Sequence, residues 1–273
     1  MSLRLAAAYY ARQLHPRHAW AFGSEYARDR LARARYRELS EAELLATRTS
    51  DTAFVLGSGS SVRDVDAAGW ERIGAGNTIS FSEFHRQRFV RADYHLVGEV
   101  ADVGQPFAEG AAEYARLLRE NPLYAETVLV LQRGWLARGS NALAGRRLLP
   151  EGTRVFRYRR TQRGVPAPPS RSFHDGLVHG WNTSFDCTNL ALLLGYRRIV
   201  LVGIDLYDRH YFWLEPGEQR PNVDTPVDEP FPTSEDVISL YGRWRELLEP
   251  EGVELSAYNP RSLLARVLPV FDA

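Results

Sequence analysis

The chain has 273 residues, of which 44% are hydrophobic, and its 34 basic residues, all of them arginine, balance 34 acidic ones. A net charge of zero excludes binding to nucleic acid or to an acidic membrane that is driven by the charge of the whole protein, and the hydrophobic fraction suffices for a globular core. Cys187 is the only cysteine and no stretch is apolar for the length of a bilayer span, so we expect a cytoplasmic protein.

Residues 1–48 carry apolar side chains at helical spacing, and residues 40–43 have the sequence of a capping box. We expect a helical extension of two or three amphipathic helices. Its exposed face is basic because of five arginines: Arg28, Arg30, Arg33, Arg35 and Arg37. We expect a solvated face, and weak association with a membrane surface or an acidic partner is the alternative. We expect a homo-oligomer, in which the extension is either an interface or a lid.

The first clear strand is the apolar run 52–56, which is followed by a turn of small residues, 57–61, and by a helix expected over 62–73. Small residues let a ligand approach the backbone, and the free N–H groups at a helix start favour an anion or a polar ligand. The glycine spacing is neither that of a dinucleotide fingerprint nor that of a P-loop. A tight turn without a ligand remains the alternative.

Strands and helices then alternate along the chain. Strands are expected over 78–84, 93–98, 127–131, 154–158, 199–202 and 253–258, and helices over 85–91, 107–120, 136–149, 185–194 and 235–248, the last of them after a Ser234 cap, with a C-terminal helix after 259–265. This order predicts an α/β fold with a mostly parallel, Rossmann-like sheet and helices on both faces. We assign residues 49–213 and 233–273 to this α/β domain.

Two proline-rich segments interrupt the pattern. Residues 157–171 hold five arginines and are expected to form a loop, either solvated or able to receive a phosphate or a sugar carboxylate. Residues 214–232 hold five prolines and several carboxylates and are expected to form a lid.

The strand 199–202 leads into Gly203, Asp205, Tyr207 and Tyr211. Ligands of open parallel sheets bind outside the carboxyl ends of the strands, so we expect these residues to form the centre of the site. The helix before this strand begins with small hydroxyl residues, which are suited to capping and to anion contacts.

Four segments form an ordered set of motifs: Ser58-Gly59-Ser60-Ser61, Thr183-Ser184-Phe185, Gly203-Ile-Asp-Leu-Tyr207 and Pro260-Arg-Ser-Leu-Leu-Ala265. In this order they resemble the bacterial sialyltransferases of glycosyltransferase family 42, whose motifs are Asn-Gly-Pro-Ser, Thr-Ser-Gly, Gly-Ile-Asp-Phe-Tyr and Pro-Asn-Ser-Leu-Leu-Ala. The resemblance covers roughly residues 52–268. It implies a GT-A-like fold and inverting transfer of sialic acid, or a related nonulosonic acid, from a CMP-sugar donor to a glycan or small-molecule acceptor, with no metal or other cofactor required.

The resemblance also implies roles for individual residues. Tyr207 and Tyr211 match the two tyrosines whose hydroxyl groups stabilise the departing phosphate. The remaining matches would hold the donor: Gly57, Ser58, Gly59, Ser60, Ser61, Ser82, Thr183, Ser184, Gly203, Asp205 and Ser262.

The general base of the family is a lid histidine, and its position here is about Phe231, which cannot take a proton. The candidates to replace it are His210 and Asp228, followed by His174, His179 and Glu229. Two other functions stay open. One is a pyrophosphokinase of the 6-hydroxymethylpterin type, which would use ATP and magnesium with Asp205 as a ligand. The other is an inactive nucleotide-binding protein of the same fold.

Overall fold

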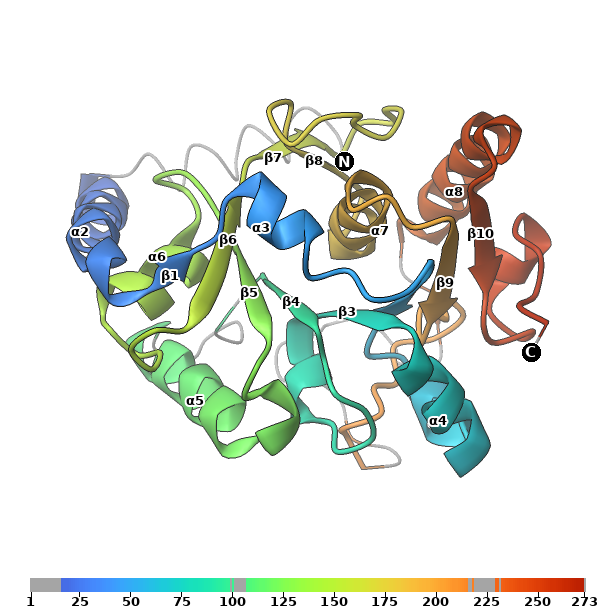
Figure 1. Ribbon diagram of the computed structural model, residues 1–273, viewed down its shortest axis with the longest axis horizontal. Coiled ribbons are helices and arrows are strands. Elements are labelled where there is room, and N and C mark those ends of the chain that lie inside the picture. Colours follow the sequence, from blue (N-terminus) through green and yellow to red (C-terminus); the bar gives the residue numbers. More distant parts are fainter. Residues whose placement is uncertain are drawn as a thin grey trace.

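The computed structural model describes residues 16–98, 100, 107–215, 218, 229–230 and 232–272. Within them, eight parallel strands form one sheet in the order β1-β6-β5-β4-β3-β2-β9-β10, and β7 pairs with β8 beside it (Figure 1). The strands are β1 (Arg37–Glu38), β2 (Thr52–Leu56), β3 (Asn77–Phe81), β4 (Tyr94–Val97), β5 (Val128–Gln132), β6 (Arg154–Tyr158), β7 (Arg160–Arg163), β8 (Leu177–Gly180), β9 (Arg198–Val202) and β10 (Glu254–Ala257). The predicted α/β class and the parallel sheet are confirmed.

Helices lie on both sides of this sheet. They are α2 (Pro16–Ala32), α3 (Glu41–Leu45), α4 (Ala67–Ala75), α5 (Phe107–Glu120), α6 (Arg138–Gly145), α7 (Thr183–Leu193) and α8 (Ser234–Leu248). None of the helices in these described ranges is both long enough and apolar enough to cross a membrane.

Strands β2, β5 and β9 are largely apolar and are buried on both faces, which is why two layers of helices can cover them. Val55 of β2 packs in a cluster with α7 and α8, whereas its neighbours Phe54 and Leu56 pack with Ile73 of α4 on the other face. Figure 1 shows α4 and α5 on one side of the sheet and α7 and α8 on the other. Helices packed on both faces therefore hold the ends of the strands in fixed positions.

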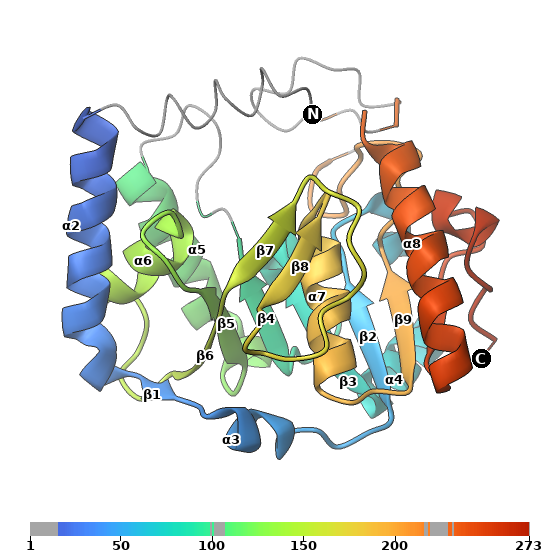
Figure 2. The ribbon, with the colours of Figure 1, turned by 90° about the horizontal axis from the view of Figure 1, so that it is seen from above.

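The strand order reverses between β2 and β9. From β2 the chain builds β3 to β6 toward one edge, whereas β9 is followed by β10 toward the other edge. Figure 2 shows β2 and β9 side by side with their arrowheads pointing the same way. Ligands of open α/β sheets bind at the carboxyl ends of the two strands that flank such a switch point.

The N-terminal segment joins the sheet as well as forming helices. The capping box is confirmed at Ser40, whose hydroxyl accepts from Glu43 N while the Glu43 carboxylate accepts from Ser40 N. Residues 37–38, expected to be helical, instead pair with β6 as an edge strand. The part of the predicted extension before residue 16 lies outside the described residues, as does most of the predicted lid.

Several predicted boundaries were wrong. The expected helix 62–73 is a 3-10 turn (Ser60–Asp64) followed by α4, because Asp66 caps α4 through Gly69 N. The expected helix 85–91 is a 3-10 turn, η3 (Ser82–Arg86), and the last helix is only a 3-10 turn (Leu263–Arg266). Ser234 does not cap α8; it is its first residue, and its hydroxyl donates to Leu206 O.

The arginine-rich segment is not simply a loop. Residues 160–163 form β7, which pairs with β8, a strand that the sequence pattern did not indicate. Three of its arginines are held by acidic partners: Arg157 by Asp29, Arg160 by Asp186, and Arg171 by Glu251. Because these three guanidinium groups are already paired with carboxylates, the segment offers fewer arginines to an anion than its five arginines suggest.

Candidate functional site

The loops that follow β2 and β9 are joined to each other through glycines. Gly57 N donates to Val202 O at 2.8 Å and Gly59 N to Gly203 O at 2.8 Å. A side chain at Gly57 would lie 2.6 Å from Gly203 O, and Gly203 has a φ of +65°. Only glycine tolerates both this close approach and this backbone conformation. Gly57 and Gly203 thus hold the loops after β2 and β9 in close contact at the switch point.

Asp205 ties together the loops after β2, β9 and β10. Its carboxylate accepts from Ser61 N at 3.0 Å, from Ser61 Oγ at 2.5 Å and from Asn259 Nδ2 at 3.3 Å, and the residue is only 4% exposed. Ser262 Oγ donates to Ile204 O at 2.8 Å from the same side. Both Asp205 oxygens are therefore engaged in shaping the loops.

A cavity of about 320 Å³ lies at this point. Ten of the predicted site residues line it: Gly57, Ser58, Gly59, Ser82, Thr183, Ser184, Gly203, Asp205, His210 and Tyr211. Four predicted residues do not line it: Ser60, Ser61, Tyr207 and Ser262. Segments 150 residues apart in the sequence thus meet at one hollow at the carboxyl edge of the sheet.

Some polar groups of the cavity wall already have hydrogen-bond partners within the protein, and others do not. Ser184 Oγ donates to Asn182 Oδ1 at 2.6 Å and accepts from Tyr241 at 2.8 Å, so this hydroxyl is engaged. The Ser58 hydroxyl is buried and makes no hydrogen bond within the described residues. A buried hydroxyl without a partner costs free energy that a ligand can recover.

Two wall residues hold a backbone conformation that side chains disfavour. Ser82 has a φ of +52° and Leu206 a φ of +66°, and both line the cavity. Left-handed conformations of non-glycine residues cost roughly 1–2 kcal/mol each and gather at functional sites.

The two tyrosines of the site have different surroundings. Residue 211 forms an isolated antiparallel bridge with Gly59, and the Tyr211 ring stacks on Trp213 with their centroids 5.7 Å apart. Tyr207 is half-buried beside Ser60, and burial, followed by the charge of Asp205, raises its pKa. A tyrosine is protonated at neutral pH even at its ordinary pKa, so Tyr207 is a hydrogen-bond donor there.

The candidate proton acceptors are dispersed. His210 lines the cavity, and its backbone N donates to Asp208 Oδ1 at 3.1 Å. His174 and Glu229 are exposed. His179 Nδ1 lies 2.5 Å from the buried Asp186 Oδ2, and neither residue lines the cavity. Asp228 and Phe231 lie outside the described residues.

The sequence reasoning missed several lining residues. They include Glu83, Trp181, Asn182, Asp208 and Arg209. In the structure Glu83 follows the end of β3 and Asn182 the end of β8, but the sequence pattern extended the first strand to residue 84 and did not indicate the second, so the strand-end rule could not locate these two residues. Asn182 caps α7 by accepting from Ser184 N at 3.0 Å, which turns the first turn of this helix toward the cavity.

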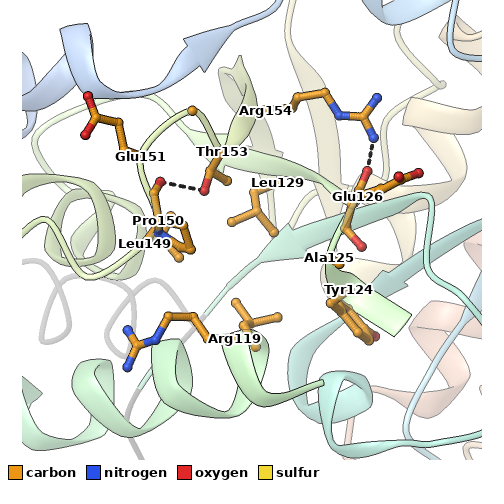
Figure 3. Close-up of a pocket in the computed structure, with 13 residues that line it drawn as sticks. Arg119, Tyr124, Ala125, Glu126, Leu129, Leu149, Pro150, Glu151, Thr153 and Arg154 are labelled. Carbon is orange, nitrogen blue, oxygen red and sulfur yellow. Dashed lines mark hydrogen bonds between the residues drawn. The ribbon is translucent and has the colours of Figure 1, made fainter. Parts of the chain in front are cut away.

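A larger cavity, of about 790 Å³, lies elsewhere (Figure 3). Its labelled side chains come from the end of α5, the start of β5 and the turn before β6, which are at the amino ends of the strands. Arg154 donates to Glu126 O and Thr153 Oγ1 to Pro150 O across its rim. None of the predicted site residues lines this cavity. Its position opposite the switch point makes it the weaker candidate despite its size.

No family model matches the sequence, and no curated protein matches it. Among solved structures, the monofunctional α-2,3-sialyltransferase Cst-I from Campylobacter jejuni is similar, with a TM-score of 0.50 and 13% identity over 85% of this chain and 82% of that chain. The sialyltransferase CstII from the same organism, in complex with cytidine-5'-monophosphate, has a TM-score of 0.43 and 11% identity, over 80% of this chain and 84% of that chain. The likeness to Cst-I confirms the fold that the resemblance to sialyltransferases implies.

Proposed function

We propose that the protein is a glycosyltransferase that moves a sugar, sialic acid or a related nonulosonic acid, from a CMP-activated donor to a glycan or small-molecule acceptor with inversion. The observation that carries the proposal is the cavity at the switch between β2 and β9, where the predicted donor-binding residues meet. The fold shared with a sialyltransferase supports the choice of donor.

The nucleotide would lie along the loops of small residues. The Ser58 hydroxyl, which has no hydrogen-bond partner among the described residues, offers one polar contact, and Gly57 and Gly59 leave room for close approach to the backbone. The start of α7 adds the Thr183 hydroxyl and the partial positive charge of a helix N-terminus, which favours a phosphate. In this arrangement the donor phosphate lies between α7 and the loop after β9.

Cleavage would rely on the two tyrosines. As the bond from the anomeric carbon to the phosphate breaks, negative charge grows on the phosphate oxygens, and hydroxyl donors aimed at them lower the barrier. Tyr211 is on the cavity wall, and Tyr207, whose pKa is raised by burial, is protonated at neutral pH as tyrosine ordinarily is. The acceptor hydroxyl attacks from the opposite side of the sugar, which inverts the anomeric centre. His210 and Asp228 are the proton acceptors proposed from the sequence.

Calorimetry with CMP and CDP tests this proposal. We expect both nucleotides to bind, and the double change Tyr207→Phe and Tyr211→Phe to weaken binding about a hundredfold or more, because hydrogen bonds to a charged phosphate contribute roughly 1.5–3 kcal/mol each. Tyr26→Phe, on α2, is the matched control and should bind as the unchanged protein does. Absence of binding, or binding that the double change leaves intact, would contradict the proposal. Preferential binding of ATP with magnesium would favour a pyrophosphokinase.

A further inference from the structure

Glu83 is a carboxylate of the cavity wall to which the resemblance gives no role. It lies in η3, directly after β3, and its side chain is 14% exposed. Arg86 Nε donates to Glu83 Oε2 at 2.6 Å, which fixes the orientation of the carboxylate. The other oxygen, Oε1, makes no hydrogen bond within the described part of the chain. One oxygen is therefore anchored and the other is available to a molecule in the cavity.

Behind Glu83 lies a histidine with an unused acceptor. His85 is fully buried, and its Nδ1 lies 3.0 Å from Ser82 O, a contact that requires a proton on Nδ1 because a carbonyl only accepts. Its Nε2 consequently carries a lone pair. This atom is buried, makes no hydrogen bond within the described residues, and lies 4.0 Å from Glu83 Oε2.

The surroundings keep this imidazole neutral. Burial lowers the pKa of His85, although the Glu83 charge opposes the shift. The Tyr114 ring of α5 packs on the His85 ring with centroids 4.2 Å apart, and His95 of β4 lies behind it at 5.9 Å. The charged groups around the pair are Arg86 and Arg88 on its own side of the sheet and Glu113 of α5, 3.8 Å from Arg86.

Glu83 and the buried Nε2 of His85 are both hydrogen-bond acceptors, so one added proton can be shared between them. When Glu83 is ionised, its oxygen and His85 Nε2 face each other with no hydrogen between them. A proton taken up on Oε1 reaches Nε2 when the carboxyl group rotates by half a turn; the unprotonated oxygen then accepts from Arg86, and the buried nitrogen gains its missing partner. The pair is built to receive a proton from the cavity.

We propose that Glu83, supported by His85, takes the proton of the acceptor hydroxyl, in place of the lid histidine for which this chain has Phe231. The hydroxyl oxygen forms the new bond to the anomeric carbon, and its proton moves to Glu83 Oε1. The bond from that carbon to the phosphate oxygen breaks, and its electron pair leaves with CMP. This inference rests on the proposed function, and His85 acts as a positioning residue.

The test measures release of CMP from CMP-N-acetylneuraminic acid with water as the acceptor, as a function of pH. A general base contributes about 10²–10⁴-fold, so Glu83→Gln should slow release by that factor and abolish the decline toward acid pH, while CMP still binds in calorimetry. Glu83→Asp should keep the acid limb at a reduced rate. Glu113→Gln, which removes a neighbouring carboxylate outside the cavity, should behave as the unchanged protein.

His85→Leu separates positioning from packing. Loss of the Nε2 acceptor removes a hydrogen bond that stabilises the protonated Glu83 carboxyl, so the decline of the rate toward acid pH, the acid limb, should move to lower pH. If His85 only fills space, the acid limb should stay where it is. The proposal is overturned if Glu83→Gln keeps the rate and pH profile of the unchanged protein, or if His210→Gln is the change that removes the acid limb. CMP binding without release from any form of the protein would instead contradict the proposed transferase reaction and, with it, the role of Glu83.

Discussion

His95 is buried between β4 and α5 with both ring nitrogens in contact. Nδ1 lies 2.8 Å from Ser80 Oγ and Nε2 lies 2.5 Å from the Tyr114 hydroxyl. A neutral imidazole offers one donor and one acceptor, which these two hydroxyls match. Burial lowers the pKa of His95 well below its ordinary value, and burial also lowers the pKa of His85 and of His179.

These histidines should make the protein sensitive to acid. A histidine whose folded pKa is lowered binds a proton more readily when unfolded, so its contribution to stability is complete above the unfolded pKa of about 6.5 and is lost as the pH falls toward the folded value. We predict that the free energy of unfolding by urea declines below about pH 6.5, by up to about 1.4 kcal/mol per pH unit for each such histidine.

The variant His95→Gln should reduce this slope, because it removes one titrating group. His174→Gln, at an exposed position, is the control and should leave the slope unchanged. An equal slope in all three proteins would rule out a contribution from a neutral buried His95.

Among the elements, the paired loops after β2 and β9 matter most to the site. Gly203 has a φ of +65°, and a side chain there would lie 2.6 Å from Gly57 O and 2.5 Å from Val62 Cγ2. Backbone and core atoms cannot move aside cheaply, so the contact would force the two strand ends apart.

We predict that Gly203→Ala lowers the free energy of unfolding by about 2–4 kcal/mol, from the left-handed strain together with the overpacking. It should also abolish CMP binding, since the loops form the cavity floor. Gly152→Ala is the matched control, with a φ of +76° and nothing within 4 Å of the added side chain. Its cost should be limited to the backbone strain, about 1–2 kcal/mol. Equal losses of stability in urea unfolding would contradict this account of the loops.

The central elements could be predicted because burial on both faces leaves a local signal. The continuous apolar runs of β5 and β9 show directly in the sequence, and the strand-end rule located Gly203, Asp205 and Tyr211. The ribbon of β7 and β8 gave no such signal, because β7 is wholly polar, β8 is short, and the two strands pair outside the main sheet. The start of α4 was misplaced because the cap at Asp66 outweighs the apolar spacing before it.

Partners of site residues could not be predicted, because they depend on contacts between distant segments. Ser61 and Asp205 are 144 positions apart, and their hydrogen bonds exist only once β2 and β9 are neighbours. For the same reason the sequence pattern placed Glu83 inside the strand expected over 78–84. Its proposed role depends on Arg86, on His85 and on the cavity that β9 and α7 complete.

At the scale of the whole molecule, a buried ion pair fastens the N-terminal segment to the sheet. Asp29 of α2 accepts from Arg157 of β6 through two hydrogen bonds, at 2.9 and 2.7 Å, and both side chains are almost fully buried. Gly145 of α6 lets α2 pack closely, since a side chain there would lie 2.8 Å from Asp29 N. The domain boundary predicted at residue 48 stays a prediction. In the structure α2 packs on α6 and β1 pairs with β6.

We predict that Asp29→Ala lowers the free energy of unfolding by about 3–5 kcal/mol, because it removes both hydrogen bonds of the buried Arg157 guanidinium and leaves only Glu38, 3.5 Å from Nε, as an acidic neighbour. Glu235→Ala, which removes an exposed partner of Arg266, should cost at most about 1 kcal/mol. Urea unfolding of both variants measures the difference. Similar small losses would show that the N-terminal segment contributes little to the stability of the sheet.

The most direct test of the central claim, that the cavity at the β2 and β9 switch holds a cytidine nucleotide, is a thermal-shift panel of CMP, CDP, AMP and ATP, each with and without magnesium. A ligand at one hundred times its dissociation constant stabilises the folded protein by about 2.7 kcal/mol. We predict a higher melting temperature with CMP and CDP that does not depend on magnesium and is lost in Gly203→Ala. A larger shift with ATP and magnesium, or no shift with either cytidine nucleotide, would contradict the claim.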